Sequence, residues 1–128
     1  MTVRRVLVVD DDAPSRLLFS TVLRHLGVAD VVAVEDGEAA VAAFQAGGFD
    51  LVLMDALMPG LDGYGATRLI RAHEARVGAP PVPVIGTSAQ EDEPTRCRSL
   101  AAGMTDVLAK PVEMARVKAL LARWAPGD

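Results

Sequence analysis

The sequence predicts an α/β protein built on a five-stranded parallel sheet with helices on both faces. Short apolar runs alternate five times with segments whose apolar residues recur at helical spacing. The apolar runs are continuous and do not alternate with polar residues, which indicates strands that are buried on both faces. Such a sheet is covered by the helices that connect its strands, so we expect the order strand then helix to repeat five times.

The first repeat begins with the apolar run Val6–Val9, which leads directly into three consecutive aspartates. Asp12 is suited to cap the following helix, because its side chain can accept a hydrogen bond from the backbone of the first turn. Pro14 is tolerated in that turn, where a backbone N–H would have no helical partner. Gly27 is expected to end the helix.

The next two strands are expected at Val31–Val34 and Asp50–Asp55. The helix between them is capped by Asp36 and extends to Ala46, and the following pair of glycines ends it. The third strand is the most apolar of the five, which favours a place at the centre of the sheet.

The second half of the chain continues the pattern. A loop rich in glycine and proline at residues 59–63 precedes a helix at Tyr64–Val77, and a proline-rich turn precedes a strand at Val82–Thr87. We then expect a helix at Asp92–Ala102, a short strand at Val107–Ala109 and a last helix.

Two of the helices carry an apolar stripe that predicts the face packed against the sheet. These packing residues are expected to be Leu18, Val22 and Leu26 in the first helix, and Met114, Val117, Leu121 and Trp124 in the last.

Length and composition limit the possible functions. A chain of 128 residues suits one domain, and we expect residues 1–128 to form it without an output domain. The composition is 51% hydrophobic but only 4% aromatic, so the core must be mainly aliphatic. A net charge of −4 gives no support for binding to nucleic acid or to a membrane surface. The apolar run near the N-terminus is too short for a signal peptide or a membrane span.

The chain has a single cysteine, Cys97, and so cannot form a disulfide within itself. This favours a reducing compartment, and the expected location is the cytoplasm. The neighbouring Arg96 and Arg98 could make the thiol reactive, whereas the alternative is an ordinary small helix residue. Because no histidine lies near Cys97 in the sequence, the ordinary residue is favoured.

Polar residues gather at the carboxyl ends of the expected strands, where parallel sheets bind ligands. They are Asp10, Asp11 and Asp12 after the first strand, Asp55 at the end of the third, Thr87 and Ser88 at the fourth, and Lys110 after the fifth. Two carboxylates about 4 Å apart repel by roughly 4 kcal/mol at an effective dielectric near 20. A hard cation would relieve that repulsion, and Mg²⁺ fits this set of oxygen ligands best. A helix cap and solvated charge explain Asp12 but explain Asp10 and Asp11 poorly.

Asp55 has three possible roles: nucleophile, metal ligand or turn former. Beside a cation, an aspartate can attack a phosphoryl group and form an acyl phosphate. Ser88 could donate a hydrogen bond to a phosphoryl oxygen, and the ammonium of Lys110 suits phosphate. Taken singly, Ser88 is an ordinary loop serine and Lys110 an ordinary surface lysine.

Five stretches of the sequence together resemble the receiver domain of two-component response regulators. They are VLVVDDD (6–12), LVLMDALMPGLDGYGATRLIR (51–71), PVIGTSA (83–89), AAGM (101–104) and LAKPV (108–112). The resemblance implies a flavodoxin-like, doubly wound (βα)5 fold with strand order 2-1-3-4-5. It also implies a protein that accepts a phosphoryl group from a sensor histidine kinase or a histidine phosphotransfer protein, without being a turnover enzyme.

The resemblance further implies a role for each matching residue. Asp55 corresponds to the phosphoacceptor, Asp11 to the direct Mg²⁺ ligand and Asp10 to an acid that acts on the metal through water. The backbone carbonyl of Leu57 corresponds to a further metal ligand.

The remaining two positions lie on the last strands. Ser88 corresponds to the hydroxyl that turns toward the phosphoryl group, and the small Ala89 after it leaves access to the site. Lys110 corresponds to the lysine that pairs with Asp55 or its phosphate, and the Lys110–Pro111 peptide bond is expected to be cis.

The sequence departs from the family pattern at three positions. Val107 stands where an aromatic residue or histidine is usual, which questions the usual output switch. Leu57 is apolar where a polar residue is frequent, and Gln90 is uncharged and cannot act as a base. The last two bear on the lifetime of a phosphoryl group.

Three other functions compete. Asp10 and Asp12 imitate the nucleophile motif of haloacid-dehalogenase-like phosphatases, but Pro14 replaces the expected threonine. A flavodoxin-like electron carrier would need a phosphate loop of Ser, Thr and Gly after the first strand. A pseudo-receiver would bind partners without being phosphorylated. A free single-domain regulator and a segment of a hybrid kinase both remain open, as a monomer or weak dimer.

Overall fold

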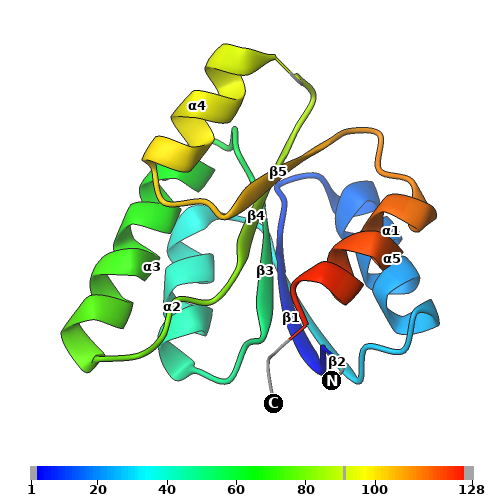
Figure 1. Cartoon of the computed structure of the whole chain (residues 1–128), viewed down its shortest axis with the longest axis horizontal. Coiled ribbons are helices and arrows are strands. Elements are labelled where there is room, and N and C mark those ends of the chain that lie inside the picture. Colours follow the sequence, from blue (N-terminus) through cyan, green and yellow to red (C-terminus); the bar gives the residue numbers. More distant parts are fainter. Residues whose placement is uncertain (1–2, 91, 126–128) are drawn as a thin grey trace.

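The structure is a computed structural model that describes residues 3–90 and 92–125. Its strands form one parallel sheet in the order β2-β1-β3-β4-β5 (Figure 1). The strands are β1 (Arg5–Val9), β2 (Asp30–Val34), β3 (Leu51–Asp55), β4 (Val84–Ser88) and β5 (Asp106–Ala109). The helices are α1 (Ala13–His25), α2 (Gly37–Ala46), α3 (Gly63–Val77), α4 (Glu93–Ala101) and α5 (Met114–Arg123). The predicted flavodoxin-like fold class and its strand order are therefore confirmed.

Burial along the strands follows their place in the sheet. Every residue of the central strands β3 and β4 is buried, and β1 is buried from Val6 to Val9. The edge strands β2 and β5 are only partly buried, because each has a neighbour on one side alone. The continuous apolar runs thus correctly indicated two covered faces, most fully in the three inner strands.

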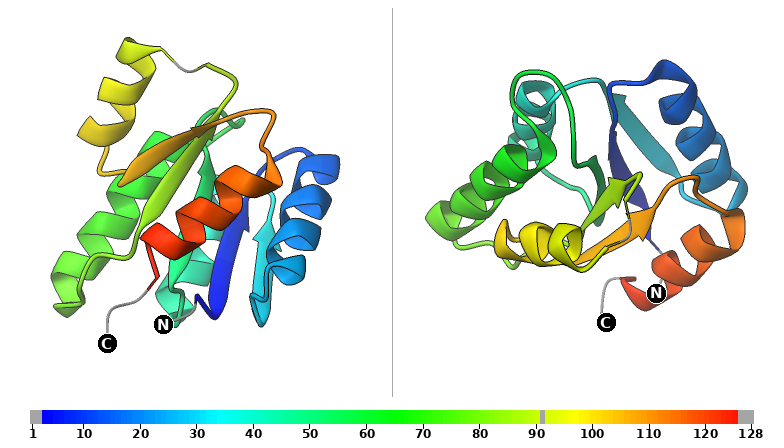
Figure 2. Two further views of the ribbon diagram at one scale, coloured as in Figure 1. Left: turned by 45° about the vertical axis from the view of Figure 1, so that its right-hand side comes forward. Right: turned by 90° about the horizontal axis from the view of Figure 1, so that it is seen from above.

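The helices divide into two layers around the sheet (Figure 2). Helices α2 and α3 cover one face, and the core beneath them includes Phe44 and Ile70. Helices α1 and α5 cover the other face over a core that includes Phe19, Leu23 and Val117. Within residues 3–90 and 92–125, no helix combines the length and the apolar character needed to cross a bilayer.

The face that α1 turns toward the sheet agrees with the predicted one at two of three residues, because Val22 and Leu26 pack against the core. Phe19 and Leu23 are buried, whereas Leu18 is 52% exposed. The core-facing surface of α1 is therefore centred one residue further along the helix than predicted, on Phe19 and Leu23. In α5 the predicted Val117 is buried, and Leu121 and Trp124 pack against the core, whereas Met114 is exposed.

Strand β4 begins two residues later than predicted, at Val84. The preceding Val82 is held by α3 instead of by a neighbouring strand. Its N–H donates to the Glu74 carboxylate at 2.7 Å, and its carbonyl accepts from Arg71 Nη1 at 2.8 Å. The guanidinium of Arg71 also pairs with Glu74 at 2.7 Å, so the buried carboxylate is neutralised and fully hydrogen-bonded.

Four of the helices begin with the same device, a capping aspartate whose side chain accepts a hydrogen bond from the third backbone N–H beyond it. The caps are Asp12, Asp36, Asp62 and Asp92. Asp12 accepts at 3.0 Å from the N–H of Ser15 and at 2.8 Å from its hydroxyl. The carboxylate of Asp12 is therefore directed to α1, as predicted, while Asp10 and Asp11 stay at the end of β1.

Candidate functional site

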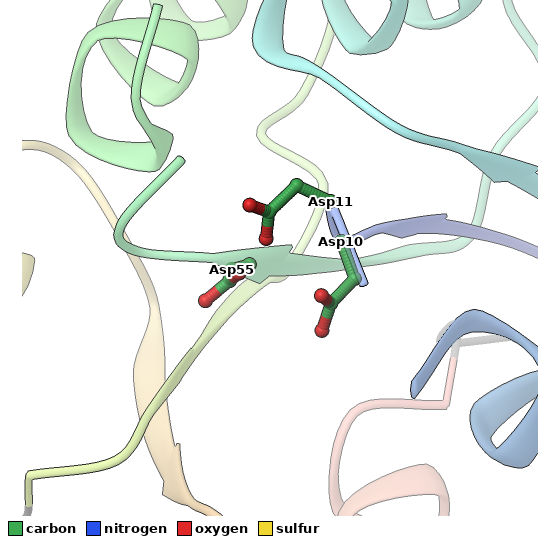
Figure 3. Close-up of side chains that lie close together, drawn as sticks. All are labelled: Asp10, Asp11 and Asp55. Carbon is green, nitrogen blue, oxygen red and sulfur yellow. The ribbon is translucent and has the colours of Figure 1, made fainter. Parts of the chain in front are cut away.

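Three carboxylates meet at the carboxyl edge of the sheet. Asp55 is the last residue of β3, and Asp10 and Asp11 follow the neighbouring strand β1. One carboxylate oxygen from each lies within 4.8 Å of the other two (Figure 3). They converge because β1 and β3 are adjacent, parallel and in register, with Val9 beside Met54. Asp10 and Asp55 are buried and Asp11 is exposed.

Asp10 is fixed by hydrogen bonds at every polar atom. Its N–H donates to the carbonyl of Val34 in β2 at 3.2 Å. One side-chain oxygen accepts from the N–H of Asp12 at 2.9 Å, and the other accepts from Lys110 Nζ at 2.9 Å. Its backbone carbonyl accepts from Arg16 Nη1 at 2.8 Å. Both carboxylate oxygens of Asp10 thus already have partners, whereas Asp11 faces solvent.

Lys110 follows β5 and reaches back across the sheet edge to the carboxylates. Its Nζ lies 2.9 Å from Asp10 Oδ2 and 3.4 Å from Asp55 Oδ1. Burial disfavours the ammonium, but the hydrogen bond that Lys110 donates to Asp10 and the negative charge of Asp55 outweigh it, so the pKa of Lys110 is raised. Lys110 is therefore a fixed positive charge in the cluster. Its peptide bond to Pro111 is cis, as the resemblance implied.

Within this cluster of carboxylates, the pKa of Asp55 is shifted. Burial is the main cause that raises its pKa to about 6, and the negative charge of Asp10 adds to it. The ammonium of Lys110 opposes this rise. An aspartate held in this way gains from any further positive charge beside it, and a metal cation would supply one.

Two further predicted site residues lie near Asp55: Ser88 at the end of β4, and Leu57 in the loop after β3. Ser88 ends β4, is buried, and its hydroxyl oxygen accepts from the N–H of Gln90 at 3.1 Å. It stands one residue beyond Thr87, the direct partner of Asp55 in the register of β3 and β4. Leu57 follows β3, and its side chain is 66% exposed. The sheet edge thus brings the predicted hydroxyl close to Asp55 and leaves an apolar side chain beside the site.

Val107 lies farther from the carboxylates, in the middle of β5. It lines a 140 Å³ cavity together with Gln90, Arg96 and two acidic residues at the start of α4. An exposed ion pair of 3.1 Å between Arg96 and Asp106 joins α4 to β5 next to this cavity. The short valine side chain therefore leaves open space at the position where an aromatic ring was expected from the family pattern.

Two residues that support the site were not singled out from the sequence. Gly63 begins α3 so close to β3 that a Cβ there would overlap the carbonyl oxygen of Asp55, and its N–H donates to Ala56 at 3.0 Å. Gly63 was predicted only as part of the loop at residues 59–63, and nothing local showed that backbone was packed against it. Arg16, which holds the Asp10 carbonyl, looks in the sequence like any exposed helix arginine.

The donor atoms of the cluster suit a hard cation. They are carboxylate oxygens, and the metal-ligating residues that gather here include neither cysteine nor histidine within the described part of the chain. Mg²⁺ binds to one or two carboxylates and keeps several waters, which matches one exposed acid, Asp11, next to two buried ones. The residues present therefore fit Mg²⁺.

Comparison with known proteins identifies the family. Residues 6–122 match the response regulator receiver domain family, and the chain belongs to that family. It is 43% identical over 120 residues to the sensor protein GacS of Pseudomonas syringae pv. syringae, which is 94% of this chain but 13% of GacS. The chain thus corresponds to a small part of that relative.

Two solved structures have the same fold. The first is the receiver domain of sensor histidine kinase PA1611 from Pseudomonas aeruginosa PAO1, which holds a magnesium ion in its active-site cleft. It has a TM-score of 0.84 and 39% identity and covers 94% of this chain and 96% of its own. The second is the receiver domain of Ssk1 from Saccharomyces cerevisiae, in complex with the histidine phosphotransfer protein Ypd1. This match has a TM-score of 0.91 and 25% identity and covers 97% of this chain and 90% of the other.

The close packing of Gly63 leads to a first prediction. We expect Gly63→Ala to lower the free energy of unfolding by about 1–3 kcal/mol, because the backbone of Asp55 and Ala56 must move away from α3 to admit the methyl group. Gly65→Ala is the matched control on the same helix, since the closest contact of its methyl group would be the flexible end of the Leu61 side chain, at 2.7 Å, and not backbone. Urea unfolding of both variants checks this. Equal stability of the two would show that α3 is not tightly packed on the Asp55 backbone.

Proposed function

We propose that this chain accepts a phosphoryl group from a phosphohistidine onto Asp55, with Mg²⁺, in a two-component or phosphorelay pathway. The observation that supports it is the position of Asp55 between a fixed ammonium, Lys110, and an exposed carboxylate, Asp11. In the transfer, one oxygen of Asp55 forms a bond to phosphorus while the P–N bond of the phosphohistidine breaks. The imidazole leaves with the electron pair of that bond.

The metal would be held by Asp11 and Asp55 directly, by the backbone carbonyl of Leu57, and by Asp10 through water. When bound, Mg²⁺ supplies positive charge that offsets the charge on the phosphoryl oxygens. The indirect role of Asp10 is consistent with its two side-chain oxygens, which already accept hydrogen bonds from Asp12 and Lys110.

The other two site residues would act on the phosphoryl group. The ammonium of Lys110, 3.4 Å from Asp55 in this structure, can pair with a phosphoryl oxygen once Asp55 is modified. The hydroxyl of Ser88 can donate to a second oxygen, because it serves as an acceptor in its bond from Gln90 and its proton stays free for donation.

The donor would be a sensor histidine kinase or a histidine phosphotransfer protein in the cytoplasm. The magnesium ion in the receiver of sensor histidine kinase PA1611 and the complex of the Ssk1 receiver with Ypd1 support this choice of cofactor and partner. The chain would be modified and later lose its phosphoryl group, rather than turn over a substrate as an enzyme does.

The phosphatase alternative is weakened by the position of Asp12. A phosphatase that used Asp10 as its nucleophile would need Asp12 as an acid at the reacting group. The carboxylate of Asp12 is instead engaged as the cap of α1 through both the N–H and the hydroxyl of Ser15. The pseudo-receiver alternative loses support because Asp11, Asp55 and Lys110 are all present at one edge of the sheet.

The nucleophile can be tested by substitution. With Mg²⁺ and acetyl phosphate, the protein should gain one acid-labile phosphoryl group, and Asp55→Asn should gain none, because an amide is a poor nucleophile. Mass spectrometry of the intact protein measures both. Asp12→Asn is the control that should still be labelled, since asparagine also caps helices well. Full labelling of Asp55→Asn would place the nucleophile elsewhere, first of all at Asp10, and would revive the phosphatase.

The metal ligands can be tested by comparing two neighbouring aspartates. Asp11→Ala and Asp12→Ala remove the same charge from the same turn, so any difference in Mg²⁺ affinity reports direct coordination. We expect Asp11→Ala to weaken binding by at least about tenfold and Asp12→Ala to have a much smaller effect. Titration calorimetry gives both dissociation constants. Equal losses would mean that Asp12 also belongs to the site.

The lifetime of the phosphoryl group is a separate prediction. Hydrolysis needs a water in line with the acyl phosphate, and neither Leu57 nor Gln90 can act as a base. We expect phosphate loss over many minutes, and Leu57→Asn should speed it about tenfold by orienting water, a change of about 1.4 kcal/mol in the barrier. Leu69→Asn, at an exposed leucine of α3, is the control that should leave the rate unchanged. Loss within seconds in the parent protein would contradict this.

A further inference from the structure

The backbone carbonyl of Asp10 lies in an unusual position for a residue at the end of a central strand. Strand β1 ends at Val9, so the ladder to β3 does not continue to this carbonyl. Asp10 is only 1% exposed, which leaves its backbone almost no access to water. The partner of the carbonyl is a side chain, Arg16 Nη1 at 2.8 Å.

This contact fixes more than one atom. A peptide bond is planar, so the carbonyl of Asp10 and the N–H of Asp11 turn together as one rigid unit. Holding that carbonyl therefore sets the direction in which the chain enters Asp11. The N–H of Asp12 is held as well, by Asp10 Oδ1 at 2.9 Å. The turn that presents Asp11 is thus fixed immediately before and after it.

Arg16 is itself held in place. Its backbone N–H donates to Asp12 at 3.0 Å within the first turn of α1, and its other terminal nitrogen lies 4.0 Å from the Glu35 carboxylate beyond β2. The side chain is 22% exposed, far less than a free surface arginine. The guanidinium therefore connects α1 to the ends of β1 and β2.

We propose that Arg16 is a positioning residue for the metal site: by holding the Asp10 carbonyl it sets the orientation of Asp11 and thereby supports Mg²⁺ binding. The inference rests on the proposed function, because it concerns the affinity of the same acidic cluster. Arg16 acts through the backbone, and its side chain is not a ligand.

Because Arg16 is charged, the proposal can be tested by whether its removal weakens or tightens Mg²⁺ binding. A positive charge near the cluster repels a cation, so removal of the charge alone would tighten Mg²⁺ binding. Loss of a positioning contact would weaken it, because Asp11 would then sample orientations that do not bind the metal. The two roles predict opposite changes in the dissociation constant.

The experiment compares two arginine variants on the same helix. Arg16→Met removes the hydrogen bond and the charge, and Arg24→Met removes an equal charge eight residues away, about 12 Å along the helix and beyond the screening length at physiological salt. Calorimetric titration with MgCl2 should show an affinity loss of about tenfold for Arg16→Met. It should show no change for Arg24→Met. Tighter binding by Arg16→Met, or unchanged binding with only a lower unfolding midpoint in urea, would overturn the proposal.

A second measurement without metal separates this proposal from the proposed function. In the Mg²⁺-free protein, Arg16→Met should speed hydrogen exchange of the Asp12 amide, measured by NMR, because the turn is no longer fixed. The amide of Ala39, whose N–H donates at 2.7 Å to the carboxylate of Asp36 that caps α2, is the internal reference that should not change. Unchanged exchange at Asp12 would overturn the role of Arg16 whatever the metal does. A parent protein that binds no Mg²⁺ while Arg16→Met still alters Asp12 would overturn the proposed function and confine Arg16 to shaping the turn.

Discussion

The repulsion among three carboxylates at the end of two buried strands is the constraint on which the rest of this molecule depends. At separations below 4.8 Å, each pair of charges opposes folding by about 3–4 kcal/mol at an effective dielectric near 20. Lys110 provides the main compensation, because its Nζ lies 2.9 and 3.4 Å from Asp10 and Asp55, and each attraction is worth about 5 kcal/mol at the same dielectric. Asp11 avoids part of the cost by staying in contact with water.

That balance explains why the polar edge needs the whole sheet. The ammonium comes from β5, at one border of the sheet, while the acids follow β1 and β3 nearer its centre. Strand β4 lies between β3 and β5, so the Lys110 side chain has to reach past the end of β4 to the acids. A change in the register of any inner strand would move the positive charge away from the acids. The site is thus a property of the sheet and not of any single loop.

The same balance leaves the site prepared for a cation and for a phosphoryl group. Asp55 keeps a raised pKa despite Lys110, mainly because burial disfavours its charged form and because the negative charge of Asp10 adds to that effect. Backbone contacts then hold the acids in place. Gly63 allows α3 to approach the carbonyl of Asp55, and Arg16 donates a hydrogen bond to the carbonyl of Asp10. Both contacts act on the main chain, so they restrict the directions of the carboxylates without using up their oxygens.

The number, type and order of the elements could be predicted from the sequence, because continuous apolar runs and capping aspartates are local signals with a direct physical meaning. The residues that gather at the carboxyl edge could be predicted too, since parallel strands place all their carboxyl ends on one side. Three features could not be predicted in this way: the pairing of Lys110 with Asp10, the burial of Phe19 in place of Leu18, and the late start of β4. The reason is that each depends on groups brought together from distant parts of the chain. Lys110 is a hundred residues from Asp10, and Val82 finds its partners in the side chains of α3. The same reason applies to Arg16 and Gly63. A hydrogen bond to a carbonyl of another element and a close approach of two backbone segments have no signal in the local sequence.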